Sequence, residues 1–241
     1  LANFLVESIG IRALMPEDHP GLHRIGMPKL DAFFDGSLDR TRILNELGID
    51  PGQPVVLYAP TWRPESSLYS HGVEFMKRVA RQQGWTLLVK LHDWVLDPAT
   101  NPIDWAKAMP ELEGPHVRFA PGRNITPYMF AADLLVSDAS SVANEYLLLD
   151  RPVIWIDVPD LIRKYNQTID LDGWGRRTGR IVSTVDELME ACADSLAQPE
   201  DFSSIRREAA ADMFYNPGHA TEAFLETLYG LLNVPEIASI D

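Results

Sequence analysis

The chain has 241 residues, of which 46% are hydrophobic, and this is enough to bury a sizeable core. Its formal net charge of −14 argues against nucleic acid as a partner, because phosphate backbones bind clustered Lys and Arg. The same charge disfavours broad attachment to anionic lipid, but an anionic substrate needs only a few local cations. No apolar run approaches the roughly 20 residues that cross a membrane. The single cysteine, Cys192, excludes an internal disulfide and fits a reducing cytosol.

Residues 1–35 differ from the rest of the chain and are interpreted as a segment, remnant or linker, leading from a preceding domain. Residues 36–233 carry alternating strand and helix signals, and residues 234–241 form a tail. The expected strands lie near residues 55–59, 86–91, 116–119, 133–136 and 153–157. The expected helices span residues 39–47, 72–83, 126–131, 142–149, 184–196, 204–213 and 220–232.

This alternation predicts an α/β fold, with a Rossmann-like, mainly parallel sheet and helices on both of its faces. In an open sheet of this kind, ligands bind at the carboxyl ends of the strands. The polar residues that follow the predicted strands are therefore the candidates for a binding site.

The turn after the strand at residues 133–136 is the most informative candidate. Ser137 and Asp138 end the apolar run, and Ser140 and Ser141 fall where the next helix begins. Free backbone N–H groups and the helix dipole at such a turn suit a phosphate, so the turn indicates a phosphate or nucleotide site. The alternative is that the two serines only cap the helix, and the residues alone favour neither interpretation.

Two carboxylates flank this turn. Glu145 lies four or five residues into the following helix, close enough to the crevice to accept hydrogen bonds from ribose hydroxyls. Its alternative is a solvated charge on the helix surface. Asp138 precedes the turn and either contacts the nucleotide or orients the backbone of the turn.

The segment Tyr58–Arg63 leaves the carboxyl end of the first predicted strand. This position brings Thr61 and Arg63 near the ligand crevice, where Arg63 could clamp a phosphate with two hydrogen bonds. The alternative is a loop packed on the sheet, with Arg63 stacked on Trp62 or facing water.

Lys90 and His92 end the second predicted strand, and their alternation with Leu91 predicts that they share one face. A histidine at this edge could act as a general acid or base, or could donate a hydrogen bond to a phosphate. The alternative, which periodicity favours, is a histidine at a strand end that bonds a neighbouring carbonyl.

Several other site classes have no counterpart in the sequence. It contains no G-x-x-x-x-G-K-[ST] phosphate loop, no G-x-G-x-x-G fingerprint and no G-x-S-x-G nucleophile elbow. It also has no His-x-x-x-His or Cys pair for zinc. We therefore expect neither a resident metal nor a cofactor.

Taken together, the motifs resemble the CDP-glycerol glycerophosphotransferase family, the teichoic-acid-type polymerases and primases. The resemblance spans about residues 26–232, and its most specific elements are the Tyr-Ala-Pro-Thr-Trp-Arg and Ser-Asp-x-Ser-Ser patterns. The matching stretches, in chain order, are Gly26–Asp31, Tyr58–Arg63, Lys90–His92, Ser137–Ser141, Arg151–Pro152 and Gly218–Thr221.

The resemblance implies one half of a GT-B glycosyltransferase fold, the C-terminal half that binds the CDP part of a CDP-alcohol donor. It implies that Ser140 and Ser141 hold the diphosphate, that Thr61 and Arg63 line the same pocket, and that His92 is catalytic or contacts phosphate. Glycerol phosphate or a related alditol phosphate would pass to a hydroxyl of a polymer or lipid-linked acceptor. The expected location is cytoplasmic, with peripheral membrane contact through regions outside this chain.

The sequence also departs from the family pattern. Asp93 replaces the proline after His92, and Ala139 replaces the tyrosine before the serines. The family's second catalytic histidine is expected from the N-terminal half, and His19 and His23 in the leading segment are weak substitutes for it. Two other functions stay open: another GT-B nucleotide-sugar glycosyltransferase or epimerase, and a non-catalytic nucleotide-binding module.

Overall fold

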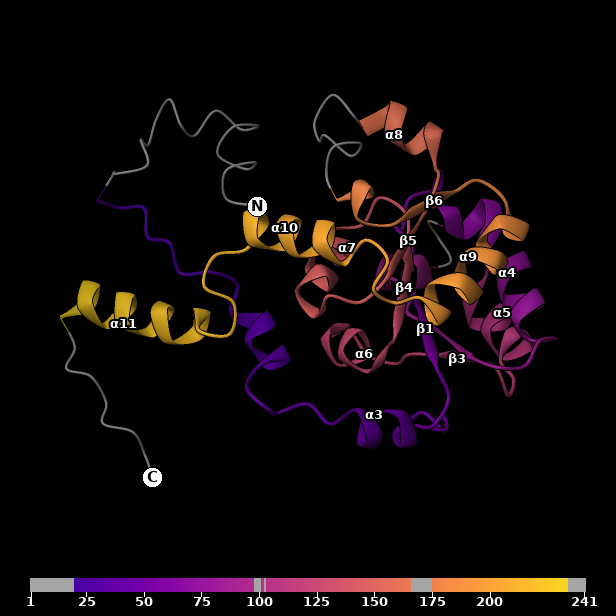
Figure 1. Cartoon of the computed structure of the whole chain (residues 1–241), viewed down its shortest axis with the longest axis horizontal. Helices are drawn as coiled ribbons and strands as arrows, with labels where there is room; N and C mark the ends of the chain where they lie inside the picture. The colour runs from indigo at the N-terminus through magenta and orange to yellow at the C-terminus, as the bar shows by residue number, and fades with distance from the viewer. Residues whose placement is uncertain (1–19, 98–100, 102, 166–174, 234–241) are drawn as a thin grey trace. The chain divides into compact units, whose positions relative to one another are not determined.

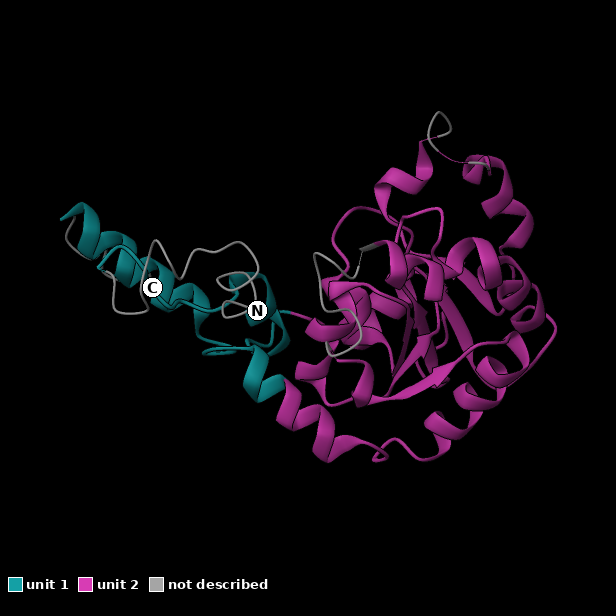
Figure 2. Ribbon diagram, turned by 90° about the horizontal axis from the view of Figure 1, so that it is seen from above, with its two compact units in different colours: residues 1–37, 210–241 teal, residues 38–209 magenta. Residues whose placement is uncertain are grey.

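The computed structural model describes residues 20–97, 101, 103–165 and 175–233. The chain divides into two compact units, residues 1–37 with 210–241 and residues 38–209, which Figure 2 shows in teal and magenta. The predicted domain division at residues 1–35, 36–233 and 234–241 stays a prediction, and the tail lies outside the described residues.

The larger unit is built on a parallel sheet of six strands in the order β3-β2-β1-β4-β5-β6. Every residue of β1, β2, β4 and β5 is buried, as expected of strands with helices on both faces. This arrangement confirms the predicted fold class. The strands are β1 (Val55–Tyr58), β2 (Thr86–Val89), β3 (Val117–Phe119), β4 (Leu134–Ser137), β5 (Val153–Ile156) and β6 (Arg180–Val182).

Helices cover both faces of this sheet (Figure 1). One face carries α4 (Val73–Val79), α5 (Trp105–Leu112) and α9 (Val185–Ala197). The other carries α6 (Thr126–Ala131) and α7 (Ser141–Tyr146), and α3 (Arg40–Glu46) packs on α6. Among the described residues, every helix is too short or too polar to cross a bilayer. The remaining elements of this part are η2 (Leu68–Gly72), η3 (Asp93–Leu96), η4 (Leu147–Leu149), α8 (Pro159–Tyr165), η5 (Arg176–Thr178) and α10 (Ser203–Met213).

The topology places a switch point between β1 and β4. From β1 the chain moves to β2 on one side, whereas from β4 it moves to β5 on the other side. The connections therefore diverge at the carboxyl ends of these two strands, where a crevice for ligands forms in open α/β sheets. Tyr58 and Val136 are register partners at this edge.

Two α-helices, α5 and α8, and the strand β6 were not predicted from the sequence, and neither were the short helices η1 (Pro28–Phe33), η3 and η5. Helix α5 contains Pro110, although proline normally breaks a helix. The first residue of this helix, Trp105, is buried. Strand β6 has three residues at the edge of the sheet, and one of them, Ile181, is 51% exposed. Tertiary packing decides such short elements, because their local signals are weak.

The smaller unit joins η1 (Pro28–Phe33) to α11 (Ala220–Leu232). The buried Asp31 carboxylate accepts hydrogen bonds from the first two amides of α11, Ala220 N at 3.1 Å and Thr221 N at 2.6 Å. Burial opposes its ionisation, but the hydrogen bonds from Thr221 and Ala220 outweigh burial and lower the pKa of Asp31. One carboxylate thus caps a helix that lies 189 positions further along the chain.

We predict that Asp31→Asn destabilises the smaller unit by about 1–2 kcal/mol, because two helix-terminal amides lose their charged acceptor. Amide hydrogen exchange in the first turn of α11 should accelerate. The stabilisation from Asp31 should be complete above the pKa of the unfolded chain, about 3.9, and should disappear as the pH falls through the lowered folded pKa.

The matched control is Asp35→Asn, which changes an exposed carboxylate of the same unit. Unchanged exchange in α11 of the Asp31→Asn variant would contradict the proposed cap.

Candidate functional site

Asp138 organises the crevice between β1 and β4. Its Oδ1 accepts hydrogen bonds from Thr61 N at 2.9 Å and Ala139 N at 2.7 Å. Its Oδ2 accepts from the backbone N of Ser67 at 2.9 Å and from the Oγ of the same residue at 2.8 Å. The residue is only 2% exposed, and its contacts with these four donors favour the interpretation that it orients backbone. Direct contact between Asp138 and a nucleotide stays a prediction.

Two further buried groups reinforce this junction. Ser137 Oγ donates to the carbonyl of Ala59 at 2.7 Å, and the Tyr58 hydroxyl lies 2.9 Å from Ser67 Oγ. Burial, together with the nearby charge of Asp138, raises the pKa of Tyr58 well above its ordinary value. The phenol therefore stays neutral and serves as a hydrogen-bonding strut between β1 and the loop that follows it.

The serine turn has the predicted position at the start of α7. Ser140 is the N-cap residue, and its Oγ accepts a long hydrogen bond of 3.4 Å from Val142 N. Ser141 is the first residue of the helix and is exposed. The cap is thus present, and the Ser141 hydroxyl faces the solvent side of the turn. A phosphate-binding role for both serines stays a prediction.

Glu145 is buried and 5% exposed, although it lies on the first turns of α7. The alternative of a solvated helix charge is therefore wrong. Asn144 beside it is 4% exposed, and its Oδ1 has no hydrogen-bond partner among the described residues. Buried polar groups normally have partners, so Asn144 is a candidate for contacts with ligand hydroxyls.

Thr61 lies beside Asp138, to which its backbone N–H donates, and its predicted role in phosphate binding stays a prediction. Within the described part of the chain, its buried Oγ1 has no hydrogen-bond partner, and neither does the Oγ of Ser66 in the same loop. Ser66 and Ser67 were not predicted as site residues, although a serine pair after a strand-end loop is a usable signal. Arg63 places its guanidinium 3.7 Å from the centre of the Trp62 ring, so the stacking alternative is observed. Phosphate binding by Arg63 stays a prediction.

Lys90 and His92 follow the end of β2 at Val89, and Lys90 is buried whereas His92 is exposed. Their shared face stays a prediction. The Lys90 ammonium is buried and donates to the carbonyl of Leu91 at 2.8 Å. Burial lowers the pKa of Lys90, and the Asp93 carboxylate opposes this effect. A phosphate contact by Lys90 stays a prediction.

His92 is exposed at the carboxyl edge of the sheet, as the N-cap residue of η3. Its Nδ1 accepts a hydrogen bond from Trp94 N at 3.2 Å, so the partner is an amide and the predicted carbonyl partner is wrong. In the neutral ring the proton therefore lies on Nε2. Partial burial lowers the pKa of His92, opposed by Asp93 and aided by Lys90. The ring is thus a neutral Nε2–H donor near pH 7.

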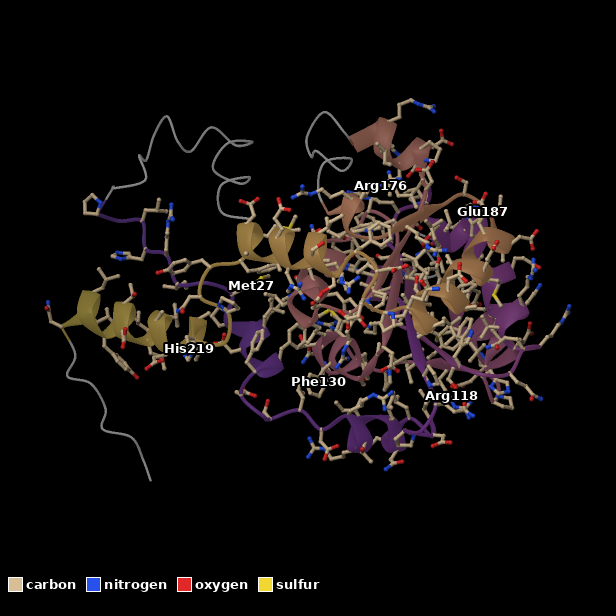
Figure 3. The ribbon with its side chains drawn as sticks, in the orientation of Figure 1. Met27, Arg118, Phe130, Arg176, Glu187 and His219 are labelled. Carbon is tan, nitrogen blue, oxygen red and sulfur yellow. The ribbon has the colours of Figure 1, made fainter. Side chains whose placement is uncertain are left out.

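Two other arginines, Arg151 and Arg176, have structural partners. Arg151 donates to the carbonyls of Phe130 and Ala132, both at 2.6 Å, and ties the end of α6 to the loop before β5. Arg176, labelled in Figure 3, forms an ion pair with Asp157 at 2.7 Å.

A separate hollow of about 630 Å³ lies along β6 and α9, with Arg180, Glu187 and Phe202 in its lining. The arginine pairs with Asp194 at 2.7 Å, and the glutamate, labelled in Figure 3, caps α9. These pairings explain the polar lining without a ligand. No group of three or more metal-ligating side chains occurs in the described ranges.

Comparisons with known proteins agree with the sequence motifs. The family model described as CDP-Glycerol:Poly(glycerophosphate) glycerophosphotransferase matches residues 12–229. The teichoic acid poly(ribitol-phosphate) polymerase of Bacillus spizizenii is 31% identical over 149 residues, which cover 58% of this chain and 23% of that protein. The teichoic acid glycerol-phosphate primase of the same organism is 25% identical over 215 residues, 84% of this chain and 50% of the primase.

A solved structure of the wall teichoic acid polymerase TagF superposes with a TM-score of 0.64 at 18% identity. It covers 95% of this chain and 55% of that one, and at this identity it shows the fold alone. The chain spans half or less of the length of the two curated relatives.

We predict that Asp138→Asn lowers the free energy of unfolding by about 2–3 kcal/mol, although the side chains have the same shape. An asparagine presents an NH₂ group to donors that need an acceptor, so two backbone amides or the Ser67 hydroxyl lose their partner. Denaturant unfolding measures the loss. Asp160→Asn, in an exposed ion pair with Arg163, is the control and should stay within about 0.5 kcal/mol of the wild type. Equal stability of the two variants would contradict the role of Asp138.

Proposed function

This chain belongs to the CDP-glycerol:poly(glycerophosphate) glycerophosphotransferase family, and we propose that it binds the CDP part of a CDP-alcohol donor at the crevice between β1 and β4. The observation that carries the proposal is the Asp138 junction, which holds the Thr61 loop against the serine turn. One of the TagF structures with this fold comes from a soak with CDPG.

The chemistry of the side chains at the crevice suggests which part of the donor each of them binds. The diphosphate binds the hydroxyls of Ser140, Ser141 and Thr61, because hydroxyl donors offset its charge without a metal. Arg63 and Lys90 are the nearby cations. The ribose hydroxyls donate to Glu145, whose burial on α7 makes it a directed acceptor.

In the proposed reaction, an acceptor hydroxyl attacks the β-phosphorus of the donor. The new P–O bond joins the alcohol phosphate to the acceptor, and the bond from the β-phosphorus to the bridging oxygen breaks, which releases CMP. His92 donates from Nε2–H to a β-phosphate oxygen and stabilises the charge that grows there. A base outside the described residues takes the proton from the acceptor hydroxyl, since the His92 tautomer favours donation.

The acceptor is proposed to be a cell-envelope polymer or a lipid-linked glycan. The enzyme that uses this acceptor would act in the cytoplasm, at the inner face of the cell membrane. Because curated relatives are at least twice as long as the stretch that matches, we expect the 241-residue chain to bind nucleotide but to transfer alcohol phosphate poorly.

We predict that replacing both Ser140 and Ser141 with alanine weakens CDP binding by about 1–3 kcal/mol, since two hydrogen bonds to phosphate are lost. Calorimetry with CDP, CMP and UDP measures the affinity. Thr184→Ala is the matched control, because it removes a helix cap of the same kind from α9. The control should leave CDP affinity unchanged. Equal CDP affinity in the folded double variant and the wild type would overturn the proposal.

We predict that His92→Ala lowers turnover by about 10²-fold or more in a protein that also carries the preceding half, with little change in CDP affinity. A group that acts on the developing charge affects the chemical step more than binding. The loss in His92→Ala should persist as the pH falls through the lowered pKa of His92, because the protonated ring keeps its Nε2–H donor and adds a positive charge.

The same assay with a chelator tests the expected independence from metal, and turnover should be unchanged. Equal losses of turnover and of CDP affinity in His92→Ala would instead assign the histidine to binding.

A further inference from the structure

Trp94 presents a large apolar surface to solvent beside His92. It is 59% exposed, whereas a tryptophan normally buries most of its ring. The turn that carries it is held firmly: its N–H donates to His92, and its carbonyl accepts from Asn101 Nδ2 at 2.8 Å. Tyr69 in turn donates to Asn101 Oδ1 at 2.5 Å. These hydrogen bonds to the backbone of Trp94 therefore hold the residue in its exposed position.

Two rings brace the indole. Trp62 meets it edge to face, with ring centres 4.5 Å apart at 85°, and His92 lies 5.5 Å away at 64°. Arg63 stacks on Trp62, and of the two tryptophans Trp94 is the exposed one. A braced aromatic ring loses little conformational entropy when a ligand packs on it.

A polar pair adjoins this ring. Asp93 and Arg123 form an ion pair of 2.9 Å, and the arginine side chain is 90% exposed. Together they offer carboxylate acceptors and guanidinium donors at the margin of the indole. Asp93 occupies the position at which the family pattern has proline, so the carboxylate of this polar pair is a difference between this sequence and the family pattern.

The cluster of Trp62, His92 and Trp94 lies on the side of the crevice that we assign to the acceptor. This assignment rests on the proposed function. Glu145 and the serine turn follow β4, which places the nucleoside on that side of the crevice. His92 and Trp94 follow β2, on the opposite side of β1. The attacking group must approach the β-phosphorus from the side away from the leaving CMP, in line with it.

We propose that Trp94, Asp93 and Arg123 form a subsite for an uncharged pyranose ring of a carbohydrate acceptor. The C–H face of the sugar packs on the indole, whose face carries negative charge density, and the sugar hydroxyls bond the ion pair. A linear polyol phosphate lacks a continuous apolar face. The Asp93–Arg123 pair carries no net charge that would attract a polyanion, so the neutral ring fits this surface better.

The test titrates N,N′-diacetylchitobiose, an uncharged N-acetylhexosamine disaccharide, into the isotope-labelled 241-residue chain, with and without CDP. The indole N–H signal of Trp94 is identified by its loss in Trp94→Phe. This signal should shift and saturate. Disaccharide affinity should fall about fivefold or more in Trp94→Ala and less in Trp94→Phe, which keeps a ring. Asp93→Asn should weaken binding as well.

Tyr215→Ala, which removes an exposed aromatic ring elsewhere, is the control and should bind the disaccharide like the wild type. Absence of a shift, or a shift produced only by a poly(glycerol phosphate) oligomer, would overturn the subsite. A fivefold loss of CDP affinity in Trp94→Ala would also overturn it, because the indole would then contact the nucleobase. Failure of the wild type to bind CDP, with the disaccharide response intact, would overturn the proposed function instead.

Discussion

The buried carboxylate of Asp138 is the interaction on which the crevice depends. It accepts from one residue of its own turn and from two residues in the loop after β1, which lie more than 70 positions earlier in the chain. A buried charge is costly unless donors surround it, and here four donors do so. The parallel pairing of β1 with β4 brings the loops together, and the carboxylate then determines their separation and the direction of their backbones.

The smaller unit uses the same chemistry for another purpose. Asp31 closes the start of α11, and Gly26, with φ of +97°, lets the chain pass close to it, since a Cβ there would lie 2.6 Å from the carbonyl of Tyr215. The Gly-x-Pro-x-x-Asp and Gly-His-Ala-Thr stretches therefore meet as parts of one structural cap. His219, labelled in Figure 3, lies exposed at this helix start, with its Nδ1 3.6 Å from Glu222 Oε2.

The candidate chemistry divides across β1. The serine turn and Glu145 belong to β4 and α7, whereas His92 and Trp94 belong to the turn after β2. This division matches a reaction between two molecules, because each side of the central strand presents different groups. Hydroxyls and a buried carboxylate suit a nucleotide, and an aromatic surface with an ion pair suits a sugar.

The sequence by itself determined strands β1–β5 and most helices, because apolar strand runs and helical periodicity are local signals. It also placed Thr61, Asp138 and the serines at one edge, since parallel strands share their carboxyl ends. Tertiary structure alone decided side-chain direction and burial. Glu145 is buried because α7 packs on β4, and His92 is exposed because β2 ends at Val89 and η3 begins after the histidine. The Asp138 and Asp31 contacts join residues far apart in the chain, and no local pattern encodes such pairs.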